Sequence, residues 1–245
     1  MYSNEFQKII EFRRSNRKFD ASIEVPDDVI RKSLERAVLS PNSSNMQLWE
    51  FYWLRTPEIK EKFVPLCLGQ QAAKTAKHMV VFVTRRDKWK ERAAWNIKKI
   101  KESVKGEPDV AVKRAMDYYG KVMPLVYMQE PLGLMTILRK SISFFAGLFK
   151  PFYRSGGSTQ QKVVVHKSCA LAAQTFMLSI AAEGFHSCPM EGFDANALDA
   201  LLNLKEKGLK STAMLTLGYR NTENDWLVNL KKVRRANNDF VTEIK

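Results

Sequence analysis

Cysteine is scarce in this chain, and its pattern excludes several kinds of site. The three cysteines, Cys67, Cys169 and Cys188, are too few and too scattered for a disulfide framework or a zinc site. Each is therefore predicted to be a small core residue. No metal site is expected, and free thiols suit a reducing cytoplasm.

Long apolar runs are also missing. No stretch reaches the roughly 18–20 residues that a membrane-spanning helix needs. The first residues, MYSNE, do not begin a charged region followed by an apolar one, so no secretory signal is visible. We expect a cytoplasmic protein.

Side chains arranged for nucleophilic or acid–base catalysis are absent as well. No Ser/His/Asp triad, metal-ligand spacing or nucleophile motif occurs. His78, His166 and His186 are isolated in the sequence and are predicted to be core or surface residues. We therefore expect no catalytic side chain.

What the chain does have is enough apolar sequence for a sizeable core, and a basic middle. It has 245 residues, 45% of them hydrophobic, which is ordinary for a globular protein. The net charge is +14, and residues 85–167 hold 18 basic and 7 acidic side chains, an excess of 11. The basicity belongs to one segment, which we interpret as a helical insertion at 85–160. A basic module at 85–154 that binds nucleic acid or an anionic membrane is the alternative function from a different class.

A short basic segment near the N-terminus is the most informative stretch. Residues 12–19 read FRRSNRKF, with three arginines, a lysine and a serine between two phenylalanines. Guanidinium groups bind phosphate or carboxylate in a bidentate manner, and a serine hydroxyl adds a donor. The segment thus predicts an anion site, and a solvated basic run is the alternative.

Two further motifs narrow the interpretation. Residues 40–49 read SPNSSNMQLW, a polar loop that leads into an apolar strand, and residues 189–194 read PMEGFD. In this order and spacing the three motifs resemble the nitroreductase family of flavin enzymes. The resemblance covers roughly 1–84 and 166–235. It departs from the family pattern at Asn42 and Leu48, where serine and proline are common.

The resemblance implies roles for cationic residues. Arg13 and Ser15 would hold the phosphate of flavin mononucleotide (FMN), with help from the backbone of Arg14. Arg17 would lie beside the N1/O2 edge of the ring, and Lys232 and Arg234 would add a second pair of phosphate cations.

It also implies polar partners for the ring. Ser43 and Asn45 would come from the other subunit of a homodimer, and Gln47 belongs to the same loop. Backbone N–H groups of Glu191 and Gly192 would face the N5/O4 edge. A further contact would come from Gln70 or Gln71, and the two remain alternatives.

The implied fold is α+β, a three-layer α/β/α sandwich around a mostly antiparallel sheet. It would form one domain over 1–245. The implied activity is an FMN-dependent oxidoreductase with NADH or NADPH as co-substrate. Its ping-pong mechanism would run through flavin N5, with nitroaromatic or quinone-like acceptors. Reductive dehalogenation or another ring reduction on the same flavin is the alternative, and no nucleic acid is expected as partner.

Periodicity predicts the elements. Helices are expected over 4–13, 27–39, 89–104, 109–123 and 166–183, and strands over 50–54, 79–83, 185–190 and 210–217, with a strand-like 240–242. In a further helix Met135, Leu138, Ile142, Phe145 and Phe149 form an apolar stripe. Packing of this helix on the body or a partner subunit is preferred. Peripheral membrane contact through 132–154 is the alternative.

Overall fold

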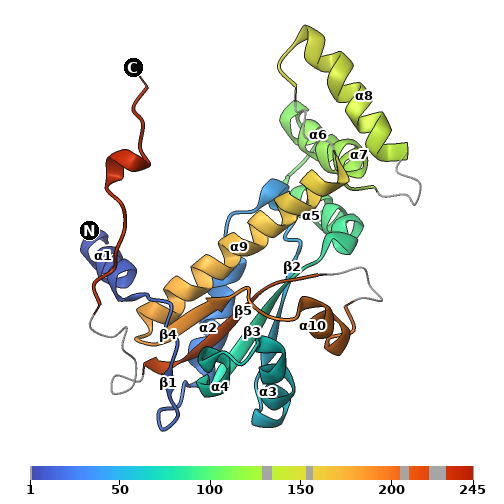
Figure 1. The fold of residues 1–245 in the computed structure, drawn as a ribbon. Helices are drawn as coiled ribbons and strands as arrows, with labels where there is room; N and C mark the ends of the chain where they lie inside the picture. The colour runs from blue at the N-terminus through green and yellow to red at the C-terminus, as the bar shows by residue number, and fades with distance from the viewer. Residues whose placement is uncertain (1, 129–133, 153–156, 205–209, 221–229, 245) are drawn as a thin grey trace.

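A five-stranded sheet forms the centre of the protein (Figure 1). The computed structural model describes residues 2–128, 134–152, 157–204, 210–220 and 230–244. The strands run in the order β1-β5-β3-β2, and β4 also pairs with β5. All these pairings are antiparallel. The strands are β1 (Phe19–Asp20), β2 (Trp49–Leu54), β3 (His78–Thr84), β4 (His186–Met190) and β5 (Lys210–Arg220).

Strand β3 is apolar on both faces because helices cover both. Val80 and Phe82 point to one core, and Met79, Val81 and Val83 point to the other. A continuous apolar run is what a strand buried on two sides requires. This arrangement confirms the predicted three-layer α+β sandwich.

Helices α2 (Asp27–Val38) and α9 (Ser158–Ala182) cover the first face. Ala172, Phe176 and Ile180 of α9 are buried there at helical spacing. By length and composition α9 could cross a membrane, but half of its most apolar window is buried against this core. It begins eight residues earlier than predicted. The Gln160 side chain accepts a hydrogen bond from the Gly157 N–H at 2.9 Å, which caps the extra turns.

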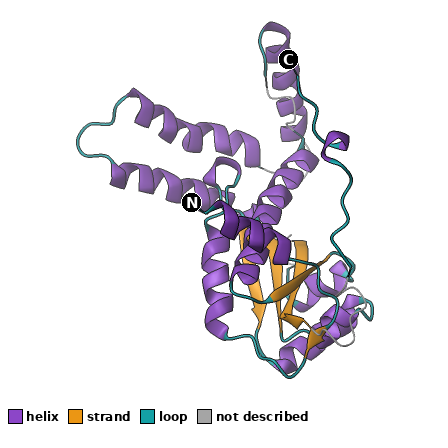
Figure 2. Ribbon diagram, turned by 90° about the vertical axis from the view of Figure 1, so that its left-hand side faces the viewer, coloured by secondary structure: helices purple, strands orange, loops and turns teal. Residues whose placement is uncertain are grey.

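Shorter helices cover the second face, and Figure 2 shows the strands between the two groups. They are α3 (Pro57–Phe63), η2 (Val64–Cys67), α4 (Gln71–Thr75) and α10 (Ala195–Leu201). Thr56 and Asp194 cap α3 and α10 by accepting from backbone N–H groups, as is typical of threonine and aspartate before a helix. The three cysteines are buried and free, which confirms them as core residues.

The basic middle is helical. It contains η3 (Arg86–Lys88), α5 (Trp89–Ser103), α6 (Val110–Asp117), η4 (Tyr118–Val122), α7 (Met123–Tyr127) and α8 (Leu134–Phe149). Its core joins Trp89, Met123 and Tyr127 to Met46 and Val165. The segment thus packs on the loop before β2 and on α9. Its treatment as an insertion at 85–160 in one domain stays a prediction.

Helix α1 (Ser3–Phe12) and the tail lie side by side at one edge of the molecule (Figure 1). The predicted strand at 240–242 is wrong. The tail contains only the short η6 (Asn237–Asp239), and residues 241–244 have no strand partner among the described residues. β-Propensity without a sheet edge to pair with does not make a strand.

Candidate functional site

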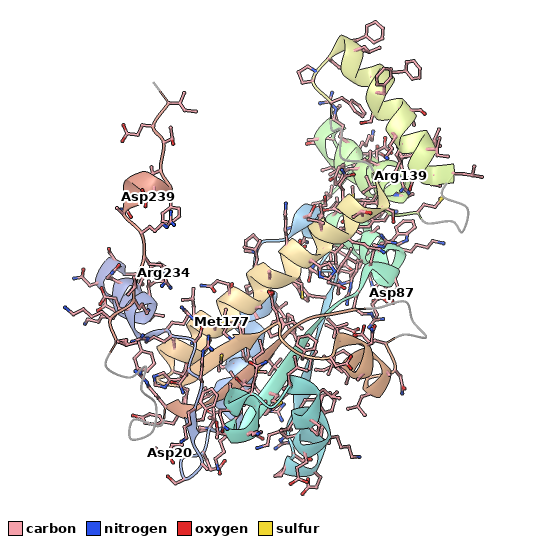
Figure 3. All side chains as sticks on the ribbon, in the orientation of Figure 1. Asp20, Asp87, Arg139, Met177, Arg234 and Asp239 are labelled. Atoms are coloured by element: carbon pink, nitrogen blue, oxygen red, sulfur yellow. The ribbon has the colours of Figure 1, made fainter. Side chains whose placement is uncertain are left out.

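Basic side chains from the two ends of the chain meet beside α1. The Nη1 of Arg14 donates to the carbonyl oxygen of Leu230 at 2.5 Å, and the Lys232 ammonium donates to the carbonyl of Ile10. Arg234 lies next to α1 as well (Figure 3). These bonds hold the tail against the segment that carries Arg13.

The electrostatics of this cluster indicate an anion site. Burial and the charge of Arg234 lower the pKa of Arg13, and burial together with Arg13, Arg14 and Arg234 lowers the pKa of Lys232. Among the described residues, none of these four cations forms a salt bridge. Glu11 offsets part of the charge at Lys232. Several positive charges gathered at a partly buried place are stabilised by a bound anion. The four residues are called the cationic cluster below.

Residues 15–17 are fixed to strand β4. Ser15 forms a parallel bridge with Ser187, and the N–H of Asn16 donates to the Ser187 carbonyl at 3.0 Å. The buried Asn16 amide donates to the carbonyl of Lys18 at 2.7 Å. Asn16 is a structural residue that sequence reasoning missed, although its place between Ser15 and Arg17 of the motif was visible.

Arg17 is exposed, but its charge acts on the same strand. Burial raises the pKa of the Cys188 thiol, and the charges of Arg17 and Arg13 pull it back down. Both guanidinium groups therefore lie within electrostatic reach of β4, whose end leads into Glu191.

The turn after β4 is held by one of the two candidate glutamines. Gln70 Nε2 donates to the carbonyl of Gly192 at 2.5 Å, whereas Gln71 begins helix α4 and is exposed. A Cβ on Gly192 would lie 3.0 Å from Gln70 Nε2, so glycine permits this close approach. The Phe193 N–H donates to the Glu191 carbonyl at 3.1 Å and tightens the turn. Gln70 and the Glu191–Gly192 pair thus lie together, just after the strand that pairs with Ser15.

The polar loop before β2 has an unusual backbone. Ser44, Asn45 and Gln47 have φ angles of 54°, 48° and 48°, in the left-handed region that non-glycine residues rarely adopt. The Asn42 side chain accepts from the Gln47 N–H at 2.8 Å and stabilises this shape. Asn42, where serine is common in the family, therefore has a function of its own in the loop.

Side chains of the basic middle brace this loop. Asn45 and Asn96 exchange two hydrogen bonds, at 2.9 and 3.0 Å. The Tyr119 hydroxyl donates to the Ser44 carbonyl at 3.0 Å, and the hydroxyls of Ser44 and Tyr118 lie 2.6 Å apart. These supporting residues were not predicted, because each pair joins segments more than 50 residues apart and no local pattern signals it.

The two halves of the predicted site do not meet within one chain. The cationic cluster lies near the C-terminal end of α9, where Phe12 packs on His186 with ring centroids 4.5 Å apart. The turn after β4 lies at the other end of that strand, where the Asp194 N–H donates to the Leu66 carbonyl. The loop with Ser43, Asn45 and Gln47 lies beside the N-terminal half of α9, where the Ser43 N–H donates to the Ser168 hydroxyl at 3.3 Å. Figure 1 shows this separation along α9.

A cavity of about 400 Å³ adjoins the loop. Ser43 and Ser44 form one wall, and mostly apolar side chains of η4, α7, α8 and α9 form the others. Cavities of this size with a few polar groups are typical of sites for small organic molecules. Among the described residues no group of three or more His, Cys, Asp or Glu side chains is placed to hold a metal ion.

These features define a class. The fold is a three-layer α+β sandwich around an antiparallel sheet, which solved nitroreductase structures share. The chain belongs to the nitroreductase family, whose model matches residues 10–219.

Named relatives and solved structures are similar to this chain along nearly its whole length. An oxygen-insensitive NAD(P)H nitroreductase of Enterobacter cloacae is 26% identical over 239 residues, which is 94% of this chain and 95% of that protein. The solved structure of ydfN from Bacillus subtilis matches with a TM-score of 0.73 at 21% identity, covering 98% of this chain and 99% of the other. A structure from Exiguobacterium sibiricum in complex with FMN has a TM-score of 0.64 at 18% identity, with 98% and 97% covered. The solved structures support the fold.

Proposed function

We propose that this protein is an FMN-dependent oxidoreductase that takes electrons from NADH or NADPH and reduces nitroaromatic or quinone-like compounds. The observation that carries the proposal is the cationic cluster. Four basic side chains from the two chain ends converge there without forming a salt bridge among the described residues, and burial lowers the pKa of two of them.

The residues present fit FMN. Its phosphate needs fixed cations, which Arg13, Arg14, Lys232 and Arg234 supply, with the Ser15 hydroxyl nearby. A cation beside the ring stabilises negative charge on the reduced flavin, and exposed Arg17 is available for this role.

The chemistry would belong to the cofactor. When bound, FMN supplies hydride or electron transfer between the nicotinamide and the acceptor. The chain's own part is to hold the phosphate, to keep the turn at Glu191 and Gly192 in place through Gln70, and to shape the space for the acceptor.

A homodimer would complete the site. The loop with Ser43, Asn45 and Gln47 lies away from the cationic cluster of its own chain, and a second copy could bring its loop to that cluster. The loop is rigid enough for this, because Asn96, Tyr118 and Tyr119 brace it. We infer a cytoplasmic enzyme, in line with its three free thiols.

The test is flavin binding. The purified protein should carry the absorption band of a bound flavin at about 450 nm. Replacing Arg13→Ala together with Arg17→Ala removes two charged contacts at about 1.5–3 kcal/mol each, so FMN affinity should fall at least about a hundredfold.

The control removes two charges elsewhere. Lys113→Ala with Arg114→Ala changes exposed residues of α6 and should leave FMN affinity unchanged. Isothermal titration calorimetry with FMN measures the affinity of both variants, and circular dichroism checks that both are folded. Full flavin occupancy in the Arg13/Arg17 variant would mean that the cofactor is bound elsewhere.

A further inference from the structure

Helix α8 buries polar side chains and exposes most of its large apolar ones. Its polar residues Arg139 and Ser143 are only 7% and 4% exposed. Its apolar residues face outward, with exposed fractions from 46% to 87%. They are Leu134, Ile137, Leu138, Phe144, Phe145, Leu148 and Phe149. These seven side chains are called the α8 face. An ordinary surface helix has the opposite arrangement.

Arg139 explains the orientation. Its Nε donates to the carbonyl of Leu125 at 2.6 Å, and its Nη2 donates to the carbonyl of Met128. Both acceptors lie at the C-terminal end of α7, where unpaired carbonyls and the helix dipole favour a cation (Figure 3). Turning the apolar stripe inward would break these bonds and expose unsatisfied backbone. Leu138, Phe145 and Phe149 of the predicted stripe therefore do not pack on the body within this chain, although Ile142 lines the cavity. Packing of the stripe on a partner subunit stays a prediction.

The α8 face is expected to be an interaction surface. Monomeric proteins rarely expose so many adjacent large apolar side chains, and contiguous patches of this kind mark interaction surfaces. Figure 1 shows α8 at the end of the molecule remote from the sheet, where a large partner can reach it.

The charges around the α8 face indicate which kind of partner would bind it. Between residues 118 and 182 the sequence has seven lysines and arginines and a single acidic residue, Glu130. Lys140 and Lys150 are exposed on and just after α8. An anionic lipid surface complements both the basic residues beside this face and its apolar residues.

We propose that α8 docks the protein on a membrane that contains anionic lipids. The helix has 16 residues, a length of about 24 Å, which is too short to span the hydrocarbon core of about 30 Å. It lies in the interface instead, with the phenylalanines among the acyl chains and the lysines at the headgroups. Residues 132, 133, 153 and 154 of the segment first considered for membrane contact lie outside the described residues.

Co-sedimentation of the full-length protein with lipid vesicles tests this. The probes are vesicles of phosphatidylcholine alone and vesicles with about one-third phosphatidylglycerol. Binding to the anionic vesicles should be at least about tenfold stronger and should weaken with salt. Phe145→Glu with Phe149→Glu puts two charges into the acyl region and should reduce binding more than about tenfold.

The matched control is Ile59→Glu with Leu201→Glu. Both residues are about as exposed as Leu138, at 42% and 43%, but lie on α3 and α10 at the other end of the molecule. The control adds the same charge and should bind vesicles like the wild type. Flavin absorbance of the same samples reports separately on the proposed function.

Two results would overturn the proposal. One is equal binding of the Phe145/Phe149 variant and the wild type. The other is a wild type that ignores anionic vesicles while the phenylalanine substitutions lower its mass in light scattering, since the α8 face would then belong to a second copy.

Discussion

His186 links the fold to pH at the scale of one residue. Its ring is 8% exposed between Phe12 and Tyr219, with centroids 4.5 and 5.8 Å away. Burial and the charge of Arg220 lower its pKa to about 4. In the unfolded chain a histidine titrates at about 6.5. Below that pH the unfolded state therefore binds more protons than the folded state. The free energy of unfolding should fall between pH 6.5 and 4, by at most about 3 kcal/mol from this residue.

The variant His186→Phe isolates this effect, because phenylalanine keeps an aromatic ring among the same neighbours and cannot titrate. Urea unfolding of both proteins across this pH range measures the difference. The wild type should lose stability more steeply as the pH falls. Parallel curves would show that His186 is not protonated differently in the two states.

Gln70 and Gln71 mark how far residue-level prediction from the sequence can go. The motif resemblance placed a polar contact at this point but left both glutamines open. The structure gives the two different surroundings, because Gln70 precedes α4 and reaches the Gly192 carbonyl, while Gln71 begins the helix. Which of them contacts the flavin stays a prediction. Neighbours in sequence point in different directions, and the turn that decides between them lies more than 100 residues away.

At the scale of elements, the pairing of β1 with β5 depends on one glycine. A Cβ on Gly218 would lie 2.7 Å from two ring atoms of Phe19 and 2.8 Å from its Cβ. Phe19 is fully buried and has no room to yield. We expect Gly218→Ala to lower the free energy of unfolding by about 1–3 kcal/mol, the usual cost of overpacking.

Gly120→Ala is the matched control. A Cβ there would meet only Ile97 Cδ1, at 3.9 Å, and the position is helical, so this change should be neutral or slightly stabilising. Urea unfolding compares the two variants. Equal stabilities would show that Phe19 moves aside without cost.

Periodicity predicted the elements well but not their surroundings. The helices and strands around the sheet follow from spacing and caps, as with Thr56 and Asp194. In α8, spacing revealed the apolar stripe but not its direction. The direction is set by Arg139 and carbonyls of another helix, which no period in the sequence encodes.

At the scale of the whole molecule, the separation of the two half-sites gives the sharpest test of a shared site. If a homodimer combines the cationic cluster of one copy with the loop of the other, two deficient variants should complement each other. One is the Arg13/Arg17 variant. The other is Ser43→Ala with Asn45→Gly, which removes two of the loop's polar side chains and is compatible with the positive φ at position 45.

Each variant alone should bind little FMN. Refolded together in equal amounts, half of the dimers would be mixed, and each mixed dimer would have one intact site, made from the cations of one chain and the loop of the other. About one quarter of all sites should then bind FMN with wild-type affinity, which a titration of flavin absorbance can count. As a control, the two variants are refolded separately and then mixed. Until subunits exchange, this mixture contains no mixed dimers and should bind little FMN. A mixture that stays empty although mixed dimers are present would mean that the cations and the loop do not share a flavin. The distance between them along α9 would then reflect two unrelated sites.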